Sequence, residues 1–176
     1  MRLFLDRVPS PLGHLWVVTD EAAALRALDF DEYEARMREL LQRHYGTVVT
    51  ESRATPQPLI ERLGAYFAGQ LSALDDVVTC TGGTPFQQQV WQTLRTIPAG
   101  ATMSYGELAR SLGNPGASRA VGLANGNNPI AIVVPCHRVV GHSGSLTGYA
   151  GGLPRKRWLL AHERRHGAEH AERLFG

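Results

Sequence analysis

Residues Ser104–Gly126, SYGELARSLGNPGASRAVGLANG, contain two short helix patterns separated by a turn. Ser104-Tyr105-Gly106-Glu107 is a capping box, so a helix is predicted from there to about Leu112, with the glycine that follows as its C-terminal cap. Asn114-Pro115 predicts a second N-cap with proline at the first helical position, and a helix through Ala124. This pattern predicts a helix-turn-helix at about residues 104–126, and an ordinary helix hairpin is the alternative.

The second predicted helix is rich in small residues. Arg119 is the one charged side chain between Gly116 and Gly126. Glycines lower helix stability, so stability alone does not explain this composition. Small side chains allow the backbone to approach another surface closely, which fits either a nucleic acid or a packed neighbouring helix. The small residues are Gly116, Ala117, Ser118, Ala120, Gly122 and Ala124.

Upstream, a third helix is predicted to begin at another capping box, Thr84-Pro85-Phe86-Gln87, with proline at its first position. Its apolar residues fall on one face, and Pro98-Ala99-Gly100 ends it. Thr81-Gly82-Gly83 is typical of a linker. We therefore predict two domains, residues 1–82 and residues 83–176.

The first domain is predicted to hold a small antiparallel sheet and two helices. Turn residues separate three short β-type runs, and two helical patterns follow. The fold class is therefore α+β, with a sheet-and-helix N-terminal domain and a mostly helical C-terminal domain. The predicted strands are 2–5, 15–18 and 25–30, and the predicted helices are about 32–44 and 58–68.

Composition indicates a globular protein. The 176 residues are 43% hydrophobic and 19% charged, which is far from a disordered or fibrous composition. Two cysteines do not make a disulfide framework and indicate a reducing compartment. No stretch is long and apolar enough for a signal peptide or a membrane span. These observations predict a cytoplasmic protein without a membrane partner.

The net charge of +2 hides an asymmetry between the two predicted domains. Residues 84–176 contain ten Lys or Arg against four acidic residues, whereas the rest of the chain has more acids than cations. This pattern is expected if only the second domain contacts a polyanion such as DNA. A solvated basic face is the alternative.

The most reactive segment is predicted at Pro135-Cys136-His137-Arg138-Val139, directly after the apolar run Ile130–Val134. We expect that run to be a buried strand or extended segment. Positive neighbours or a proton acceptor would lower the pKa of the Cys136 thiol and favour the nucleophilic thiolate, and Glu163 could orient the histidine. A buried structural cysteine is the alternative. No metal site is expected, because Cys136 and His137 are too close together for an ordinary zinc ligand pair.

This segment resembles the active-site signature of the DNA alkyltransferases that repair O6-alkylated guanine. Weaker similarities to the bacterial members lie at residues 11–13 and 66–69. The resemblance covers about Thr84 to Glu163, with the segments in the family's order and spacing. Those flanking segments are Ser104-Tyr105-Gly106, Arg119-Ala120-Val121-Gly122, Asn128-Pro129, Thr147-Gly148-Tyr149-Ala150-Gly151-Gly152 and Trp158-Leu159-Leu160-Ala161-His162-Glu163.

The resemblance implies a catalytic role for five residues. Cys136 would accept the alkyl group, and His137 would deprotonate the thiol through a water. Glu163 would orient His137, and Asn128 would hold the turn that presents the active-site segment. Tyr105 would assist nucleotide flipping and donate a proton to the leaving guanine.

It also implies how DNA would bind. The partner would be double-stranded DNA with an alkylated guanine, contacted in the minor groove by a monomer, with the damaged base flipped out. Arg119 would fill the gap in the base stack. Tyr105, Ala117, Ser118 and Gly122 would complete the DNA surface. The base pocket would be formed by Pro135, Val139, Tyr149 and Ala150.

The implied reaction is the stoichiometric, irreversible transfer of the alkyl group from O6-alkylguanine, and from O4-alkylthymine, to Cys136. No residue is placed to remove the alkyl group from the thioether, and no cofactor is needed. Ala150 and Ala131 stand where some family members have Ser and Pro, which predicts a roomier pocket that accepts larger alkyl groups. The chain lacks the cysteine cluster of the members that act as transcriptional activators.

Three other functions are open on the residues alone. An alkylated-DNA damage sensor would bind lesions without transfer, although such relatives lack the acceptor cysteine. A helix-turn-helix regulator would bind a specific duplex sequence regardless of Cys136. A thiol hydrolase using Cys136 and His137 would turn over repeatedly on small esters.

Overall fold

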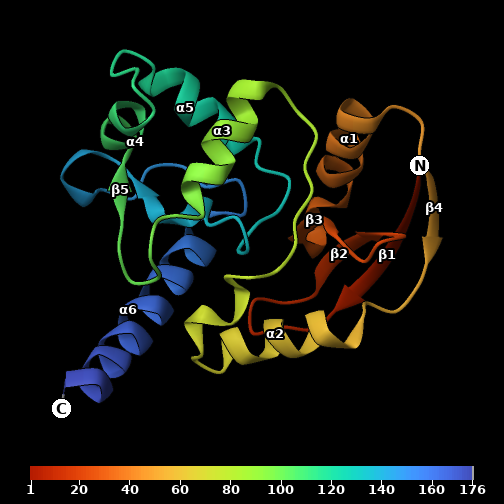
Figure 1. Ribbon diagram of the computed structural model, residues 1–176, viewed down its shortest axis with the longest axis horizontal. Helices are drawn as coiled ribbons and strands as arrows, with labels where there is room; N and C mark the ends of the chain where they lie inside the picture. Colours follow the sequence, from red (N-terminus) through yellow and green to blue (C-terminus); the bar gives the residue numbers. More distant parts are fainter. Residues whose placement is uncertain (176) are drawn as a thin grey trace.

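A computed structural model describes the backbone of residues 1–175 and the side chains of residues 1–167. A sheet with its two helices occupies one end of the molecule, and the remaining helices occupy the other (Figure 1). The N-terminus lies at the sheet end and the C-terminus at the far end of the last helix (Figure 1). The predicted α+β class is confirmed.

The sheet has four strands in the order β3-β2-β1-β4. The antiparallel strands β1 (Arg2–Val8), β2 (Leu15–Asp20) and β3 (Leu25–Phe30) confirm the three predicted strands. The strand β4 (Val49–Ser52) was not predicted, and it pairs parallel with β1, so the sheet is mixed. All four residues of β4 are exposed, which removes the alternation that reveals a half-buried strand.

Two helices cover opposite faces of the sheet. The short turn η1 (Asp31–Tyr33) leads into α1 (Glu34–Tyr45), and α2 (Gln57–Phe67) is followed by η2 (Leu71–Leu74). Both helices lie close to their predicted positions. Helix α1 closes a small apolar cluster made of Leu3, Leu5, Val18, Ala27, Met37 and Leu41.

The other face of the sheet belongs to a larger core that includes α2 and the C-terminal helices. The edge strand β3 is tied to the later chain, because Leu28 N donates to Pro129 O at 3.0 Å and Ala131 N donates to Leu28 O at 2.9 Å. The two parts therefore share one continuous core. The domain boundary at residue 82 stays a prediction.

Capping explains where the first C-terminal helices begin. In α3 (Pro85–Leu94) the predicted capping box is complete, since the side chain of Thr84 accepts from Gln87 N and the side chain of Gln87 accepts from Thr84 N. Helix α4 (Tyr105–Ser111) begins where Ser104 Oγ accepts from Glu107 N at 3.0 Å. Both predicted starts are confirmed.

The start predicted for the next helix was wrong. Helix α5 covers Ser118–Gly126, and residues 114–117 form a turn in which Asn114 O accepts from Ala117 N at 3.0 Å. Because this turn satisfies the backbone locally, Pro115 lies between the two helices rather than at the first position of the second. Residues 112–117 therefore separate the two helices by a longer turn than predicted, and the helix-turn-helix stays a prediction.

The chain after α5 consists of short elements that lead to the last helix. The pair β5 (Met103–Ser104) and β6 (Val139–Val140) is parallel, and it joins the start of α4 to the end of the cysteine segment. The turns η3 (Cys136–Arg138) and η4 (His142–Gly144) flank β6.

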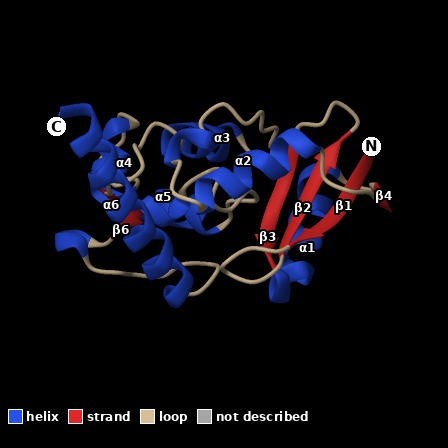
Figure 2. Ribbon diagram, turned by 90° about the horizontal axis from the view of Figure 1, so that it is seen from below, coloured by secondary structure: helices blue, strands red, loops and turns tan. Residues whose placement is uncertain are grey.

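Helix α6 (Leu153–Phe175) runs diagonally away from the body of the molecule (Figure 1) and lies with α4 and α5 at the end opposite to the four-stranded sheet (Figure 2). The buried face of α6 includes Lys156, Leu159 and Glu163. Residues 164–175 continue this helix to its end at Phe175. Within the described backbone, no helix is long and apolar enough to cross a membrane.

Candidate active site and nucleic-acid interface

The apolar run before the cysteine is buried as predicted, but it is not a strand. Ile130–Val134 forms tight turns in which Val134 N donates to Ile130 O at 3.1 Å, and Ile132 adopts a left-handed φ of 70°. A β-branched residue rarely takes this conformation, so the surrounding contacts must impose it. A strand was predicted because a short buried run has the same hydrophobicity whether it is extended or folded into turns.

Asn128 holds this turn through its side-chain amide. Its Nδ2 donates to Val134 O at 2.8 Å and to Ile130 O at 3.2 Å, and its Oδ1 accepts from Ile130 N at 3.0 Å. One amide side chain therefore closes both ends of the turn. The turn leads directly to Pro135 and Cys136, which are both buried.

Cys136 begins η3 and is 5% exposed. Burial raises the pKa of its thiol, and the neighbouring Asn128 amide and Lys156 ammonium only partly oppose this effect. The expectation of a lowered thiol pKa was therefore wrong, because desolvation outweighs the positive neighbours. At rest the sulfur carries its proton, so a nearby base is needed to make it nucleophilic.

His137 and Glu163 are both fully buried and lie in direct contact, with 2.8 Å between His137 Nε2 and Glu163 Oε2. Burial lowers the pKa of His137, although Glu163 opposes the shift, so the imidazole is neutral. Its proton lies on Nε2, facing the carboxylate. The other ring nitrogen, Nδ1, is buried and has no hydrogen-bond partner among the described residues.

The Glu163 carboxylate is held by a network larger than the sequence indicated. Arg138 Nε donates to Oε1 at 2.8 Å and Arg138 Nη2 to Oε2 at 2.9 Å, while the Tyr66 hydroxyl donates to Oε2 at 2.6 Å. Burial by itself raises the pKa of Glu163, but His137 and Arg138 outweigh it and hold the pKa well below its usual range. Glu163 is therefore an ionised, fully partnered carboxylate. We refer to His137, Glu163, Arg138 and Tyr66 as the relay cluster.

Lys156 is a second buried charge that the sequence analysis missed. Its Nζ donates to three backbone oxygens, those of Val139 at 2.7 Å, Thr147 at 3.0 Å and Gly148 at 3.2 Å. Burial lowers the pKa of Lys156. It ties the end of the cysteine segment to the following loop. The available signal was its position seven residues before Glu163, which places both on one face of a helix.

Three of the predicted base-pocket residues, Pro135, Val139 and Tyr149, lie next to Cys136. Val139 is fully buried, and the Tyr149 hydroxyl is buried without a hydrogen-bond partner among the described residues. Burial raises the pKa of Tyr149 well above its ordinary value, so the hydroxyl keeps its proton. The carbonyl of Ala150 accepts from Arg36 Nη1 at 2.6 Å, which anchors this loop to the N-terminal part. A protonated hydroxyl beside the Cys136 thiol is suited to donate to an acceptor atom of a base.

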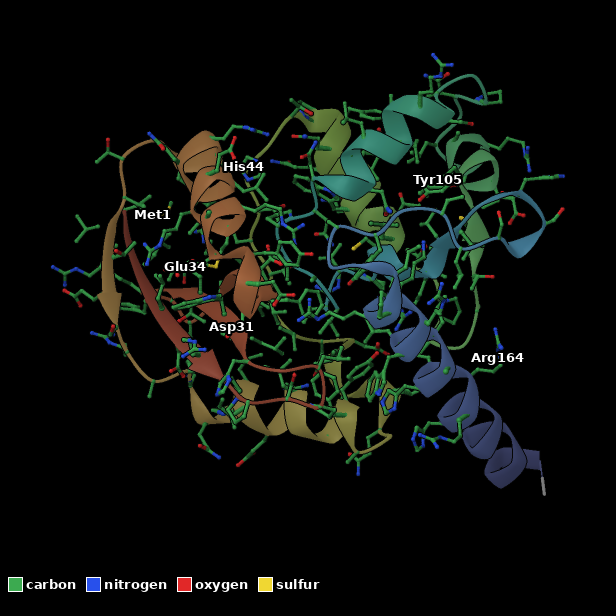
Figure 3. All side chains as sticks on the ribbon, turned by 180° about the vertical axis from the view of Figure 1, so that it is seen from behind. Met1, Asp31, Glu34, His44, Tyr105 and Arg164 are labelled. Carbon is green, nitrogen blue, oxygen red and sulfur yellow. The ribbon has the colours of Figure 1, made fainter. Side chains whose placement is uncertain are left out.

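The residues of the predicted DNA surface lie together on α4 and α5. Tyr105 begins α4, in the C-terminal part of the molecule (Figure 3), and is partly buried. Its ring packs on Gly122 of α5, where an added Cβ would lie 3.7 Å from Tyr105 Cδ1. A cleft of about 610 Å³ lies beside Tyr105, between α4 and residues 140–144. Arg119 is exposed, Ser118 is the first residue of the same helix, and Ala117 directly precedes it.

One contact joins this surface to the cysteine. Asn125, on the buried side of α5, donates through Nδ2 to the carbonyl of Cys136 at 3.3 Å. Trp91 of α3 holds the same turn of α5 by donating from Nε1 to Ala124 O at 2.9 Å. The α5 backbone is therefore fixed relative to the cysteine segment.

Two family models match the chain. One is described as the 6-O-methylguanine DNA methyltransferase ribonuclease-like domain, over residues 6–78, and the other as the DNA binding domain of the same family, over residues 85–165. A methylated-DNA–protein-cysteine methyltransferase of Shigella flexneri is 56% identical over 93% of this chain and 96% of its own. The chain belongs to the 6-O-methylguanine DNA methyltransferase family. The family resemblance and the enzyme class predicted from the sequence are confirmed at this level.

Solved structures agree with this assignment. The crystal structure of Mycobacterium tuberculosis OGT in complex with DNA is 44% identical, covers 94% of each chain and has a TM-score of 0.77. An O6-methylguanine-DNA methyltransferase from Pyrococcus kodakaraensis is 25% identical, with a TM-score of 0.66 over 92% of this chain and 98% of its own. DNA repair by alkyl transfer and DNA binding are therefore properties of this family. The roles of individual residues stay predictions.

Proposed function

We propose that this protein transfers one alkyl group from O6-alkylguanine in double-stranded DNA to Cys136, acting as a monomer and without a cofactor. The observation that carries the proposal is the buried thiol of Cys136 directly followed by His137, a neutral base whose other ring nitrogen is held by ionised Glu163. Transfer from O4-alkylthymine is proposed as a second, weaker substrate activity. Residues 1–82 would support the site, and residues 83–176 would carry the chemistry and bind the DNA.

The DNA step follows from the surface of α5. The target oxygen is not accessible inside the duplex, so the nucleotide must be flipped out, which requires a few kcal/mol. The small residues of α5 would let its backbone approach the minor groove, and Arg119 would replace the lost stacking. Tyr105, at the start of α4, would guide the rotated nucleotide toward Cys136.

The chemical step begins with removal of the thiol proton. His137 Nδ1 would take this proton through a water, while Glu163 stabilises the positive charge that forms on the imidazole. The thiolate then forms a bond to the alkyl carbon, and the carbon–oxygen bond to guanine breaks with its electron pair left on guanine. Tyr105 would donate a proton to the guanine and recover one from solvent.

Protein mass after incubation with a duplex that contains one O6-methylguanine tests the proposal. We expect a gain of one methylene per protein, located on Cys136 by peptide mapping and saturating at one equivalent. Cys136→Ser should abolish the gain, whereas Cys80→Ser, which alters the other free cysteine, should retain it. Lesion binding without any mass gain would mean a damage sensor instead, and a duplex with O4-methylthymine tests the second substrate.

A further inference from the structure

Tyr66 brings the N-terminal part of the molecule into the relay cluster. It lies near the end of α2, is fully buried, and donates its hydroxyl proton to Glu163 Oε2 at 2.6 Å. This is the shortest of the contacts made by Glu163, which range from 2.6 to 2.9 Å. A hydrogen bond to a charged carboxylate is about twice as strong as one between neutral groups.

The backbone of Tyr66 is fixed by the same helix that carries Glu163. His162 Nε2 contacts Tyr66 O at 2.8 Å, and burial lowers the pKa of His162, so this imidazole is neutral and donates. Trp158 stacks on His162 with ring centroids 4.7 Å apart. Two consecutive residues of α6 therefore hold both ends of Tyr66, and its hydroxyl has a single well-defined direction.

The Tyr66 hydroxyl competes with His137 for one oxygen. Oε2 accepts from Tyr66, from His137 Nε2 and from Arg138 Nη2, whereas Oε1 accepts from Arg138 Nε. Burial, reinforced by the nearby carboxylate, raises the pKa of Tyr66 well above its ordinary value, so the phenol remains a donor at all working pH values. Besides Glu163 and Arg138, the Lys156 ammonium also acts on His137, and it lowers the pKa of the imidazole.

We propose that Tyr66 is a positioning residue for the alkyl transfer: its hydroxyl fixes Glu163 and limits how strongly Glu163 holds His137. The inference rests on the proposed function, in which His137 is the base. It makes the N-terminal part a contributor to the chemistry rather than a support alone. Tyr66 touches neither the thiol nor the DNA surface, and it acts only through Glu163.

Replacement of the phenol by a phenyl ring tests this role. In Tyr66→Phe the competing donor is lost, Glu163 holds the Nε2 proton more strongly, and protonated His137 is favoured. The rate of alkyl transfer falls at low pH, where His137 becomes protonated, and we expect the midpoint of this fall to move to higher pH by about half a unit. The matched control is Tyr45→Phe, which likewise removes one tyrosine hydroxyl. That hydroxyl bonds to Cys80 O and Gly82 N instead of to the relay cluster, so the midpoint should be unchanged.

A second variant gives the opposite sign and preserves the packing. Site-specific 3-fluorotyrosine at position 66 has a more acidic phenol, which donates more strongly and should move the midpoint to lower pH. The His137 Nε2 proton resonance, recorded without DNA, should shift downfield in Tyr66→Phe and upfield with fluorotyrosine. If the wild type transfers no alkyl group but the resonance shifts, the proposed function fails and the relay contact stands. If neither midpoint nor resonance moves in either variant, the inference is overturned.

Discussion

The relay cluster and the outer face of α5 are built on opposite physical principles. His137 and Glu163 are fully buried, and every oxygen of Glu163 has fixed donors. On α5, Arg119 is exposed and Leu123 is 70% exposed, and Arg119 makes no ion pair or hydrogen bond with the described residues. Proton transfer needs a desolvated base in one geometry, whereas contact with DNA needs groups that are not already engaged.

Loss of the carboxylate should produce the largest effect, confined to the buried side of this comparison. In Glu163→Gln the imidazolium loses its stabilising charge, so we expect transfer to slow by about 10²-fold, as measured by quenched-flow mass spectrometry. Binding of methylated duplex should be unchanged. Glu61→Gln, at an exposed position on α2, is the control. An unchanged transfer rate would remove Glu163 from the mechanism.

Acid should lower the free energy of unfolding through the relay cluster, whereas the α5 surface should not contribute to this loss. The pKa values of His137 and Glu163 are both lowered in the folded protein, so the unfolded chain binds more protons. Stability is therefore complete near neutral pH, begins to fall below about pH 6.5, and falls further below about pH 4.5. Urea unfolding should show a loss on the order of 2 kcal/mol between pH 7 and pH 4. Glu163→Gln should flatten the lower part of this curve, and an equal slope in the variant would contradict the assignment.

On the exposed side, Arg119→Ala should separate DNA handling from chemistry. We expect repair of a methylated duplex to slow by about tenfold, or ~1.4 kcal/mol, because nothing fills the gap in the base stack. The reaction of Cys136 with free benzylguanine should be unaffected, since no base has to be flipped. Arg110→Ala, an exposed cation on α4, controls for charge alone. Equal losses on the two substrates would rule out a flipping role.

The smallest expected effect concerns the alkyl group. The family resemblance implies that Ala131 and Ala150 are smaller than the residues of some members at these positions. Methyl, ethyl and benzyl guanines should therefore react with rates within about tenfold of one another, or ~1.4 kcal/mol. Single-turnover rates on the three substrates measure this. Ala150→Ser should disfavour the largest group. A steep preference for methyl in the wild type would contradict the roomier pocket.

Local sequence signals predicted local structure well. The Thr84 and Ser104 caps fixed the starts of α3 and α4, because a side-chain cap acts within three residues of itself. Two segments were misassigned because a local pattern fits more than one structure. Asn114-Pro115 fits a helix start or a turn, and the apolar run Ile130–Val134 fits a strand or a buried turn. The exposed strand β4 carried no hydrophobic pattern at all.

The candidate site likewise contains residues that the sequence could name and contacts that it could not. The segment Pro135–Val139 and the sites of Asn128, Arg119 and Glu163 could be named from the sequence through the family's collinear motifs. The contacts of Tyr66 could not, because its partner Glu163 is 97 residues away in the chain. Lys156 stood in a basic stretch where a solvated charge is the ordinary expectation.

The sequence by itself determined the α+β class, the family, the cysteine segment and the helix pair. These depend on residue types at short spacings, which act through local hydrogen bonds and periodicity. Only the tertiary structure decided the direction of the Cys136 pKa, the burial of Arg138 and Lys156, and the joining of α2 to α6 at Glu163. Desolvation and long-range contacts exist only once distant segments pack together, and they set the chemistry of the site.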